Sequence, residues 1–337
     1  MIIQENISLK AFNTFGIDVK ARYFTEVTTL EDLKAVLTQK EHPDKFILGG
    51  GSNMLLTRNI DALVVYINLK GIEVISSTEE EVDIAVRAGE NWHEFVCWCI
   101  ENNYGGLENL SLIPGNVGTA PIQNIGAYGV ELKDVFISCH AWHKENAEEQ
   151  VFSLEDCKFG YRDSVFKNEL KGKYIITQVN FRLSRKDHKL NTSYGAIQQH
   201  LEDSNINSPT IRDVSEAVIA IRRSKLPDPK EIGNSGSFFK NPVISRLKFD
   251  SLLEKYPNMP SYRISDTEIK VPAGWLIEQC GFKGKRFGDA GIHERQALVL
   301  VNHGNASGKE IWQLATEIRA TVKDTFDIDI EPEVNVI

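Results

Sequence analysis

The chain has 337 residues, with a hydrophobic content of 42% and a charged content of 25%, which are ordinary for a globular protein. This length predicts two or three domains. The formal net charge of −9, without a long basic run, argues against nucleic acid or an anionic membrane as the main partner. No apolar stretch reaches the roughly 18 residues that a membrane span requires, and the first residues lack the features of a signal peptide. The scattered cysteines are interpreted as buried free thiols in a reducing cytoplasm, without a metal site.

The first part of the chain alternates helical and strand patterns. Apolar spacing predicts a helix over 29–37, with Thr28 or Thr29 as its N-cap, and an amphipathic helix over 91–101. Continuous or alternating apolar residues predict a buried strand over 63–67 and a hairpin over 71–89.

The second part is predicted in the same way. Short strands are expected over 135–143, 148–154, 173–183 and 296–301, and helices over 211–225, 273–280 and 309–326. The polar, breaker-rich segment 205–210 marks a candidate domain boundary.

A first glycine cluster follows a short apolar strand: Gly49, Gly50, Gly51, Ser52 and Asn53. The spacing differs from G-x-G-x-x-G, and no Lys-Ser/Thr pair follows as in a P-loop. Alone, this cluster is a weak signal of phosphate binding.

A second cluster lies about sixty residues further on, in LSLIPGNVGTAPIQNIGAYG at 110–129. It combines glycines and prolines with apolar residues and almost no charge, so its backbone N–H groups must find partners. Glycine permits close approach of main chain to a bulky anion, and backbone amides bind pyrophosphate well. The two clusters together predict a cofactor held from two sides. An Ω-loop without a ligand is the alternative.

Three polar segments are candidate chemical groups. Arg162 in FGYRDSVF has apolar neighbours, where burial of an unpaired guanidinium would be costly, although an ion pair with Asp163 is an alternative. Ser237 in GNSGSFFKNP lacks the context of a hydrolase nucleophile, which favours a positioned proton carrier. Glu331 and Glu333 in EPEV have the spacing that places two carboxylates on one side of an extended strand, and disturbance of this arrangement by Pro332 is the alternative.

These segments carry a family resemblance. GGGSNMLL, IPGNVGTAPIQNIGAYG, FGYRDSVFK, KLPDP, GNSGSFFKNP, AGWLIEQCG, QALVLVN and EPEV occur in this order. Together they resemble the UDP-N-acetylenolpyruvoylglucosamine reductase family over nearly the whole chain. The segment Asn191–Gly195, with Tyr194, resembles the tyrosine loop of the family's longer first type, which closes over the substrate.

The resemblance implies an α+β protein with the FAD-binding fold of the vanillyl-alcohol-oxidase class in two lobes and a separate α/β C-terminal substrate domain. It places the lobes at 1–70 and 71–210 and the substrate domain at 211–337. It also implies FAD bound non-covalently, since no histidine or cysteine tether is present in either glycine cluster. NADPH would be the co-substrate in reducing UDP-N-acetylglucosamine enolpyruvate to UDP-N-acetylmuramate, for peptidoglycan synthesis.

In the family reaction, hydride passes through flavin to the enolpyruvyl group, and negative charge develops beside its carboxylate. By motif position, Arg162 resembles the arginine that polarises this carboxylate, Glu333 the assisting glutamate, and Ser237 the acid that protonates the α-carbon. The remaining roles are implied by position alone. The expected cofactor-binding residues are Gly49, Gly50, Gly51, Ser52, Asn53, Ile113, Pro114, Gly115, Gly118, Thr119, Gln123, Asn124, Gly126, Ala127 and Tyr128. The expected substrate-binding residues are Tyr194, Arg222, Lys225, Asn241, Tyr262, Lys270 and Gln296.

We therefore expect a cytoplasmic, monomeric enzyme. For Lys225 and Lys270, the alternative to substrate binding is that the side chains are solvated and contact no ligand. Two rival functions are a flavin oxidase of the same fold class, which the C-terminal motifs disfavour, and a non-enzymatic regulator that binds a flavin or a nucleotide. The regulator would lack Arg162, Ser237 or Glu333, and all three are present.

Overall fold

The computed structural model describes all 337 residues, which form two compact units. Unit 1 comprises Met1–Ile7, Ala21–Gly50 and Ile60–Ser224, and unit 2 comprises Ser8–Lys20, Gly51–Asn59 and Lys225–Ile337. This division differs from the boundaries expected from the sequence, because two N-terminal segments join the C-terminal unit. The three-part division at 70 and 210 stays a prediction about functional lobes.

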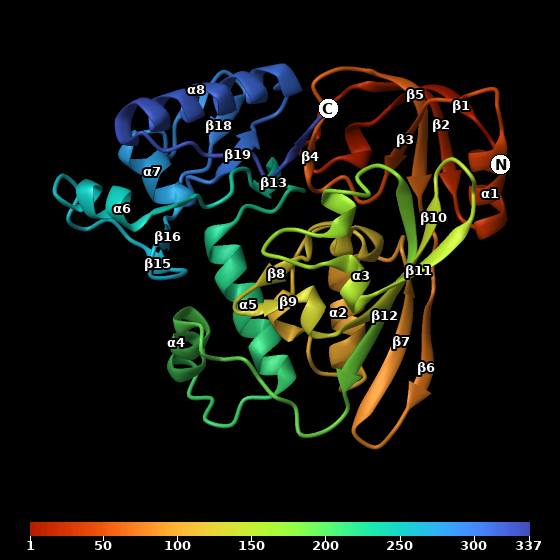
Figure 1. The fold of residues 1–337 in the computed structure, drawn as a ribbon, viewed down its shortest axis with the longest axis horizontal. Helices are drawn as coiled ribbons and strands as arrows, with labels where there is room; N and C mark the ends of the chain where they lie inside the picture. Colours follow the sequence, from red (N-terminus) through yellow and green to blue (C-terminus); the bar gives the residue numbers. More distant parts are fainter. The chain divides into compact units, whose positions relative to one another are not determined.

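Unit 1 contains a small sheet near the start of the chain (Figure 1). Its strand order is β1 (Gln4–Ser8), β2 (Lys20–Val27), β5 (Ile60–Ile67) and β3 (Lys45–Leu48), with β2 and β3 both parallel to β5. The helix α1 (Leu30–Thr38) is capped by Thr29, which accepts a hydrogen bond from Asp32 N–H as the sequence predicts. Leu33, Val36 and Leu37 bury the inner face of α1 against this sheet.

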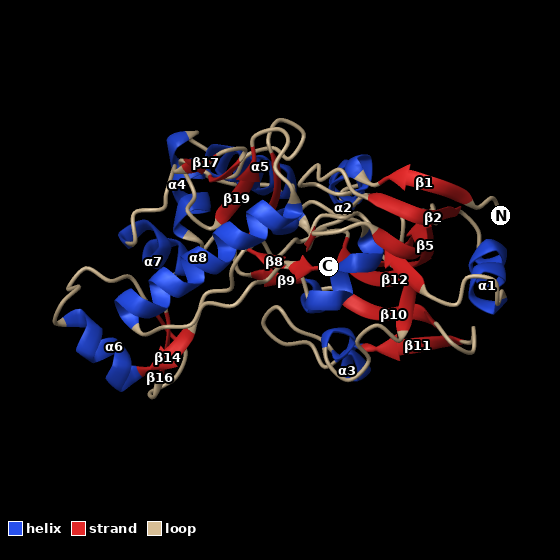
Figure 2. Cartoon of the chain, turned by 90° about the horizontal axis from the view of Figure 1, so that it is seen from above, coloured by secondary structure: helices blue, strands red, loops and turns tan.

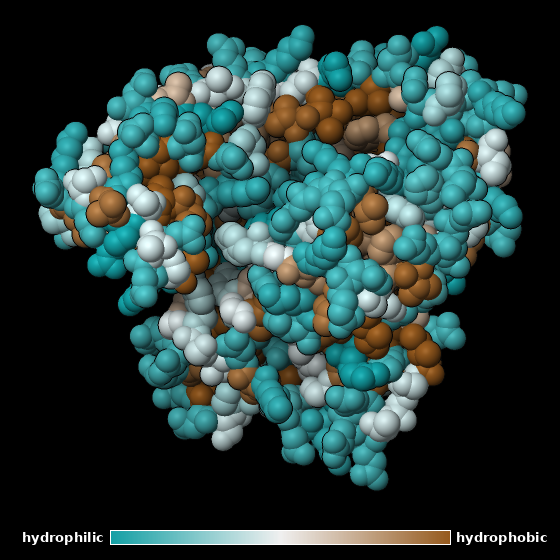
Figure 3. Space-filling model, in the orientation of Figure 1, coloured by the Kyte–Doolittle hydropathy of each residue, from teal (hydrophilic) through white to brown (hydrophobic).

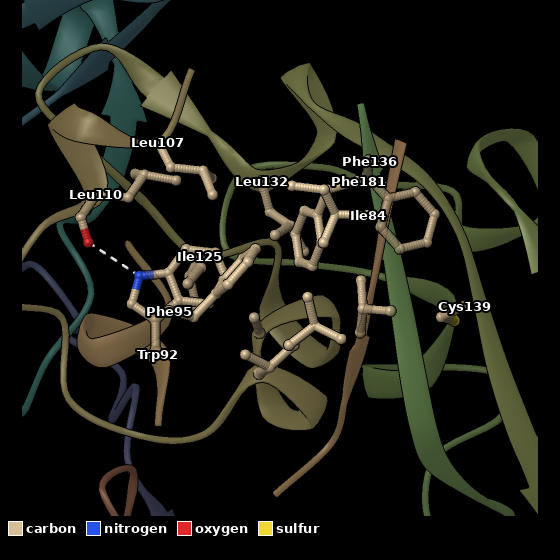
Figure 4. Close-up of a cluster of buried hydrophobic side chains, with 14 of the residues drawn as sticks. Ile84, Trp92, Phe95, Leu107, Leu110, Ile125, Leu132, Phe136, Cys139 and Phe181 are labelled. Atoms are coloured by element: carbon tan, nitrogen blue, oxygen red, sulfur yellow. Dashed lines mark hydrogen bonds between the residues drawn. The ribbon is translucent and has the colours of Figure 1, made fainter. Parts of the chain in front are cut away.

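A second, antiparallel sheet of unit 1 has the order β11 (Glu149–Ser153), β10 (Phe136–His143), β12 (Tyr174–Ser184), β7 (Glu81–Arg87) and β6 (Ile72–Ser77). The predicted hairpin and the three predicted strands are confirmed in it. The helix α2 (Trp92–Glu101) packs Trp92 and Phe95 against Phe181 of β12, and the Trp92 indole donates to the Leu110 carbonyl (Figure 4). This cluster is the main core of unit 1 and underlies the long glycine loop.

Several short elements complete unit 1: α3 (Leu154–Cys157), β8 (Gly126–Ala127), β9 (Val130–Glu131), and the 3-10 helices η2 (Glu108–Leu110), η3 (Val117–Gln123), η4 (Leu132–Asp134) and η5 (Val165–Lys167). The helices α4 (Gly195–Asp203) and α5 (Ile211–Lys225) pack through Ile197, Leu201, Val214 and Val218. The sequence predicted α5 with these bounds but assigned it to the C-terminal domain, whereas its residues up to Ser224 belong to unit 1.

Unit 2 also mixes helices and strands (Figure 2). One sheet has the order β13 (Gly233–Ser237), β19 (Val299–Asn302), β18 (Ala290–Ile292) and β17 (Arg286–Phe287), and a smaller one has the order β14 (Val243–Ser245), β16 (Glu268–Lys270) and β15 (Tyr262–Arg263). Its helices are η1 (Lys10–Phe12), α6 (Arg246–Leu253), α7 (Ala273–Gln279) and α8 (Gly308–Phe326). The strands β4 (Met54–Leu55) and β20 (Asn335–Val336) pair in parallel.

The long C-terminal helix shows why the sequence prediction succeeded there. Ser307 and Glu310 form a capping box at its start, and Ile311, Leu314, Ile318 and Val322 are buried at helical spacing.

The face of the molecule in Figure 3 is mostly hydrophilic, with apolar side chains in between. None of the helices combines the length and the apolar character that a membrane span requires.

Candidate functional site

The two glycine segments meet within unit 1. A Cβ atom placed on Gly49 would lie 2.6 Å from Thr119 Cγ2, and one on Gly50 would lie 2.9 Å from the Cα of Gly115. At Gly50 the contact is with main chain, so glycine is required there for the two segments to approach this closely, whereas at Gly49 the contact is with the end of the Thr119 side chain. The sequence prediction that these two segments belong to one site is consistent with this contact.

The long loop is more ordered than its composition suggested. It contains η3 (Val117–Gln123), and the N–H groups of Val117 and Gly118 donate to the carbonyls of Glu90 and Ala88 at 2.9 and 3.0 Å. A Cβ on Gly118 would lie 2.4 Å from the Cβ of Ala88. The N–H groups of Val117 and Gly118 thus donate to carbonyls of the protein itself. Glycine is needed at position 118 because a Cβ there would collide with Ala88.

The far end of the loop anchors the turn that carries Arg162. Asn124 is fully buried with φ of 44°, and its amide donates to the Gly160 carbonyl at 3.0 Å. Ser164 Oγ donates to the Ile122 carbonyl at 2.6 Å. Of the other loop residues expected to bind the cofactor, Pro114 is exposed and five are partly buried: Ile113, Gln123, Gly126, Ala127 and Tyr128.

Arg162 itself lies in a tight turn with a left-handed backbone. Gly160 and Asp163 exchange backbone hydrogen bonds of 3.1 and 3.3 Å, and Arg162 between them has φ of 54°. Residues other than glycine rarely adopt the left-handed backbone conformation. Those that do are often found at functional sites. Arg162 therefore has the kind of backbone strain that often marks a functional site.

A second arginine, Arg222, lies close enough to Arg162 for the charge of Arg162 to lower the pKa of Arg222. Burial lowers the pKa of Arg222, the positive charge of Arg162 lowers it further, and a hydrogen bond with Tyr128 opposes both effects. Burial likewise raises the pKa of Tyr128. The ring of Tyr194 meets that of Tyr128 edge-on, with centroids 5.1 Å apart. Within unit 1, two neighbouring cations and two phenols thus form a cluster suited to an anion.

In unit 2, Ser237 is the last residue of β13, just after an irregularity in the pairing with β19. Between Asn234 and Ser237 the register shifts; Gly236 there has φ of 68° and donates to Asn234 Oδ1 at 2.9 Å. Ser237 then pairs with Val299. Bulges of this kind redirect a side chain next to an active site.

Glu333 lies beside that strand end. Its N–H donates to the Phe238 carbonyl at 2.8 Å, and Lys240 N–H donates to the Glu331 carbonyl at 2.9 Å. Asn53 of the first glycine segment donates to the Glu333 carbonyl at 3.4 Å. Unit 2 therefore brings together Ser237, Glu333 and Asn53, which are far apart in the sequence.

The predicted substrate residues of unit 2 gather around the start of α7. Asn241 Oδ1 accepts from Ala273 N–H at 3.0 Å, and Gln296 Oε1 would lie 3.1 Å from a Cβ on Gly274. The ammonium of Lys270 lies 5.9 Å from the ring centre of Tyr262. Lys225, at the end of α5, is exposed and is not placed in this group.

Two residues that support these groups were missed in the sequence. Ser235 Oγ donates to the Ser52 carbonyl at 2.6 Å and so fixes the part of the first glycine segment that belongs to unit 2. Asn109, which is 1% exposed, donates to the carbonyls of Tyr128 and Asn191 at 3.1 and 2.8 Å. A short polar residue next to a glycine loop has no distinctive spacing, so no sequence signal was available for either.

The loops of unit 1 fit a cofactor that bears a pyrophosphate. Close contact at Gly49 and Gly50, together with left-handed backbone at Gly115 and Tyr128, gives main chain of the kind that binds phosphate oxygens without side-chain interference.

Comparison with known proteins agrees with this geometry. The model of the UDP-N-acetylenolpyruvoylglucosamine reductase C-terminal domain matches residues 228–337, and that of an FAD binding domain matches residues 21–147. The UDP-N-acetylenolpyruvoylglucosamine reductase of Flavobacterium johnsoniae is 59% identical over 337 residues and covers all of both chains. That of Chromobacterium violaceum is 49% identical over 332 residues, covering 97% of each.

Solved structures give the fold. The reductase of the same name from Thermus caldophilus has a TM-score of 0.70 at 24% identity and covers 99% of both chains. A solvent-stable cholesterol oxidase has a TM-score of 0.50 at 11% identity, covering 99% of this chain and 86% of its own. The α+β fold of the vanillyl-alcohol-oxidase class, expected from the sequence, is confirmed.

Proposed function

The chain belongs to the family of UDP-N-acetylenolpyruvoylglucosamine reductases, and from this premise we propose that Arg162, Ser237 and Glu333 are its catalytic residues. As a member it is an FAD-dependent oxidoreductase of peptidoglycan precursor synthesis, a UDP-N-acetylmuramate dehydrogenase that uses NADPH. The residue roles below are our proposal.

The two glycine segments and the loop residues named above would hold FAD without a covalent bond. When bound, the flavin supplies the hydride, taking it from NADPH and delivering it to the enolpyruvyl group of the substrate. The protein contributes position and electrostatic field. Asn124 and Ser164 contribute indirectly, because they fix the Arg162 turn to the loop.

Arg162 would stabilise the charge that develops at the substrate carboxylate. Its guanidinium can form a two-pronged bond with a carboxylate, and such charge-assisted bonds are among the strongest. The neighbouring Arg222 makes the region more positive, which favours an anion further. Because the charge grows during the reaction, the benefit falls mainly on the transition state.

Ser237 would donate the proton that completes the reduction. A hydroxyl is a weak acid, so it must be held in place and supported. The bulge before Ser237 gives the residue a fixed position. Glu333, whose N–H donates to the carbonyl of the next residue, Phe238, places a carboxylate-bearing residue beside it. Glu333 would assist the same enolic system.

The remaining assignments are also proposals. Tyr194 and Arg222 of unit 1 and Lys225, Asn241, Tyr262, Lys270 and Gln296 of unit 2 would bind the sugar nucleotide. The segment that carries Tyr194 would close over it. We further propose a cytoplasmic monomer that acts on this sugar nucleotide and NADPH, with neither nucleic acid nor membrane as a partner.

The observation that carries this assignment of roles is Arg222, which is hydrogen-bonded to Tyr128 and lies close enough to Arg162 for the two charges to interact. The test follows the visible flavin absorption of purified protein without oxygen. NADPH should bleach the absorption, and the enolpyruvyl sugar nucleotide should restore it. Restoration only when oxygen is admitted would instead indicate an oxidase.

A further inference from the structure

Leu112, at the entrance of the long loop, has a backbone conformation that leucine rarely adopts. Its φ is 58°, in the left-handed region that favours glycine because a Cβ crowds the adjacent carbonyl. The residues Ile113–Gly115 follow directly. The direction in which the loop starts therefore depends on how Leu112 is held.

Both polar backbone groups of Leu112 are bound by side chains from distant segments. Its N–H donates to Nδ1 of His93 in α2 at 3.0 Å, and its carbonyl accepts from Nε of Arg222 in α5 at 3.3 Å. Leu112 is thus fixed on two sides, and the same contact orients Arg222.

The bond to Leu112 also defines the state of the His93 ring. Since Nδ1 accepts, neutral His93 carries its proton on Nε2. Burial lowers the pKa of His93, as do the charges of Arg223 and Arg222, while Glu94 raises it. The thiol of Cys97 is 3.8 Å from both ring nitrogens. The surroundings therefore favour the neutral ring that can accept.

We propose that His93 is a positioning residue that holds Leu112 in its left-handed conformation and thereby sets the start of the cofactor loop and the orientation of Arg222. The importance of that loop for FAD and of Arg222 for substrate rests on the proposed function. We call the hydrogen bonds from Leu112 to His93 and from Arg222 to Leu112 the Leu112 clamp. The clamp can be tested without FAD or substrate.

The test compares variants of the full-length protein. His93→Leu removes the acceptor. His93→Asn restores an oxygen near the position of Nδ1, whereas His93→Gln places it near Nε2. Leu112→Gly supplies a residue that adopts the left-handed region without a clamp. Cys97→Ser is the matched control, because Cys97 touches the His93 ring but not Leu112.

In the FAD-free protein, hydrogen exchange of the Leu112 amide should accelerate about tenfold in His93→Leu, as expected for loss of one hydrogen bond. His93→Asn should recover most of the protection; His93→Gln should not. FAD affinity, from quenching of flavin fluorescence, should fall about tenfold in His93→Leu and recover when Leu112→Gly is added. Cys97→Ser should match the parent in both measurements.

Unchanged exchange at Leu112 in His93→Leu would overturn the clamp. So would a loss of FAD affinity that Leu112→Gly does not repair, because His93 would then act by another route. If His93→Leu does not fold, the contrast between His93→Asn and His93→Gln decides the question. Failure of the parent to bind FAD would contradict the proposed function and leave the exchange result standing.

Discussion

Gly50→Ala should damage cofactor binding through a collision that the structure locates. The new Cβ would lie 2.8 Å from Asn116 Oδ1, 2.9 Å from Gly115 Cα and 3.0 Å from Asn116 N, where ordinary contact begins near 3.4 Å. Two of these atoms are main chain, so the glycine segments must separate by about half an ångström. Overpacking of this kind costs about 1–3 kcal/mol.

For a unit of this size, that cost lowers the midpoint of thermal unfolding by several degrees, at ~2–4 °C per kcal/mol. FAD affinity should fall at least about tenfold, since the displaced main chain is what we assign to the cofactor. Differential scanning calorimetry of the FAD-free protein and fluorescence titration with FAD separate the two effects.

Gly195→Ala is the matched control. A Cβ on Gly195, the first residue of α4, would meet no atom within 4 Å. Alanine there should raise the unfolding free energy slightly, by up to about 1 kcal/mol, and leave FAD binding unchanged. A Gly50→Ala protein that melts and binds FAD like the parent would refute the close packing of the two segments.

Further outcomes are expected. Acid or heat should release intact FAD, and flavin that stays on the denatured protein would contradict non-covalent binding. Arg162→Met should slow turnover by orders of magnitude while NADPH still bleaches the flavin normally; equal loss in both half-reactions would indicate a structural arginine. Ser237→Ala should accept hydride normally and slow only the reaction with substrate, seen by anaerobic stopped-flow absorbance, with partial recovery in Ser237→Cys. Because the pKa of His93 is lowered from its ordinary 6.5, the folded state resists its protonation, so the unfolding free energy should drop as pH falls below 6.5. Chemical denaturation across that pH range should show a smaller drop for His93→Asn.

Elements with strong local signals were predictable from the sequence. Ser307 and Glu310 define the start of α8, and Asn91 caps α2 by accepting from Glu94 N–H, as an N-cap should. In each case the signal lies within one helical turn. The predicted strand over 296–301 instead begins at Val299, because Val299 N–H bonds to the Gln296 carbonyl in a turn.

Elements that depend on distant partners were not predictable. Helix α4 has only Ile197 and Leu201 buried, and both need α5 to cover them. The 3-10 helix within the glycine loop is fixed by the carbonyls of Ala88 and Glu90, which no pattern inside the loop reveals. The same holds for the site. Motif position pointed to Arg162 and Ser237, whereas Ser164, which ties the turn of Arg162 to the Ile122 carbonyl, became apparent only from its contacts.

Unit 2 is built from chain segments that are far apart in the sequence, and this affects how it folds during synthesis. Thr57 N–H donates to the Ile337 carbonyl, and Ile337 N–H donates to the Leu55 carbonyl, each at 2.9 Å. Asn302 also donates to the Phe15 carbonyl at 2.9 Å. On the ribosome, the early segments 8–20 and 51–59 therefore lack these partners until the residues up to Ile337 have been synthesised, because their pairing joins residues up to 287 positions apart. A fragment that begins at 225 lacks these segments, so the C-terminal unit is not expected to fold when produced separately.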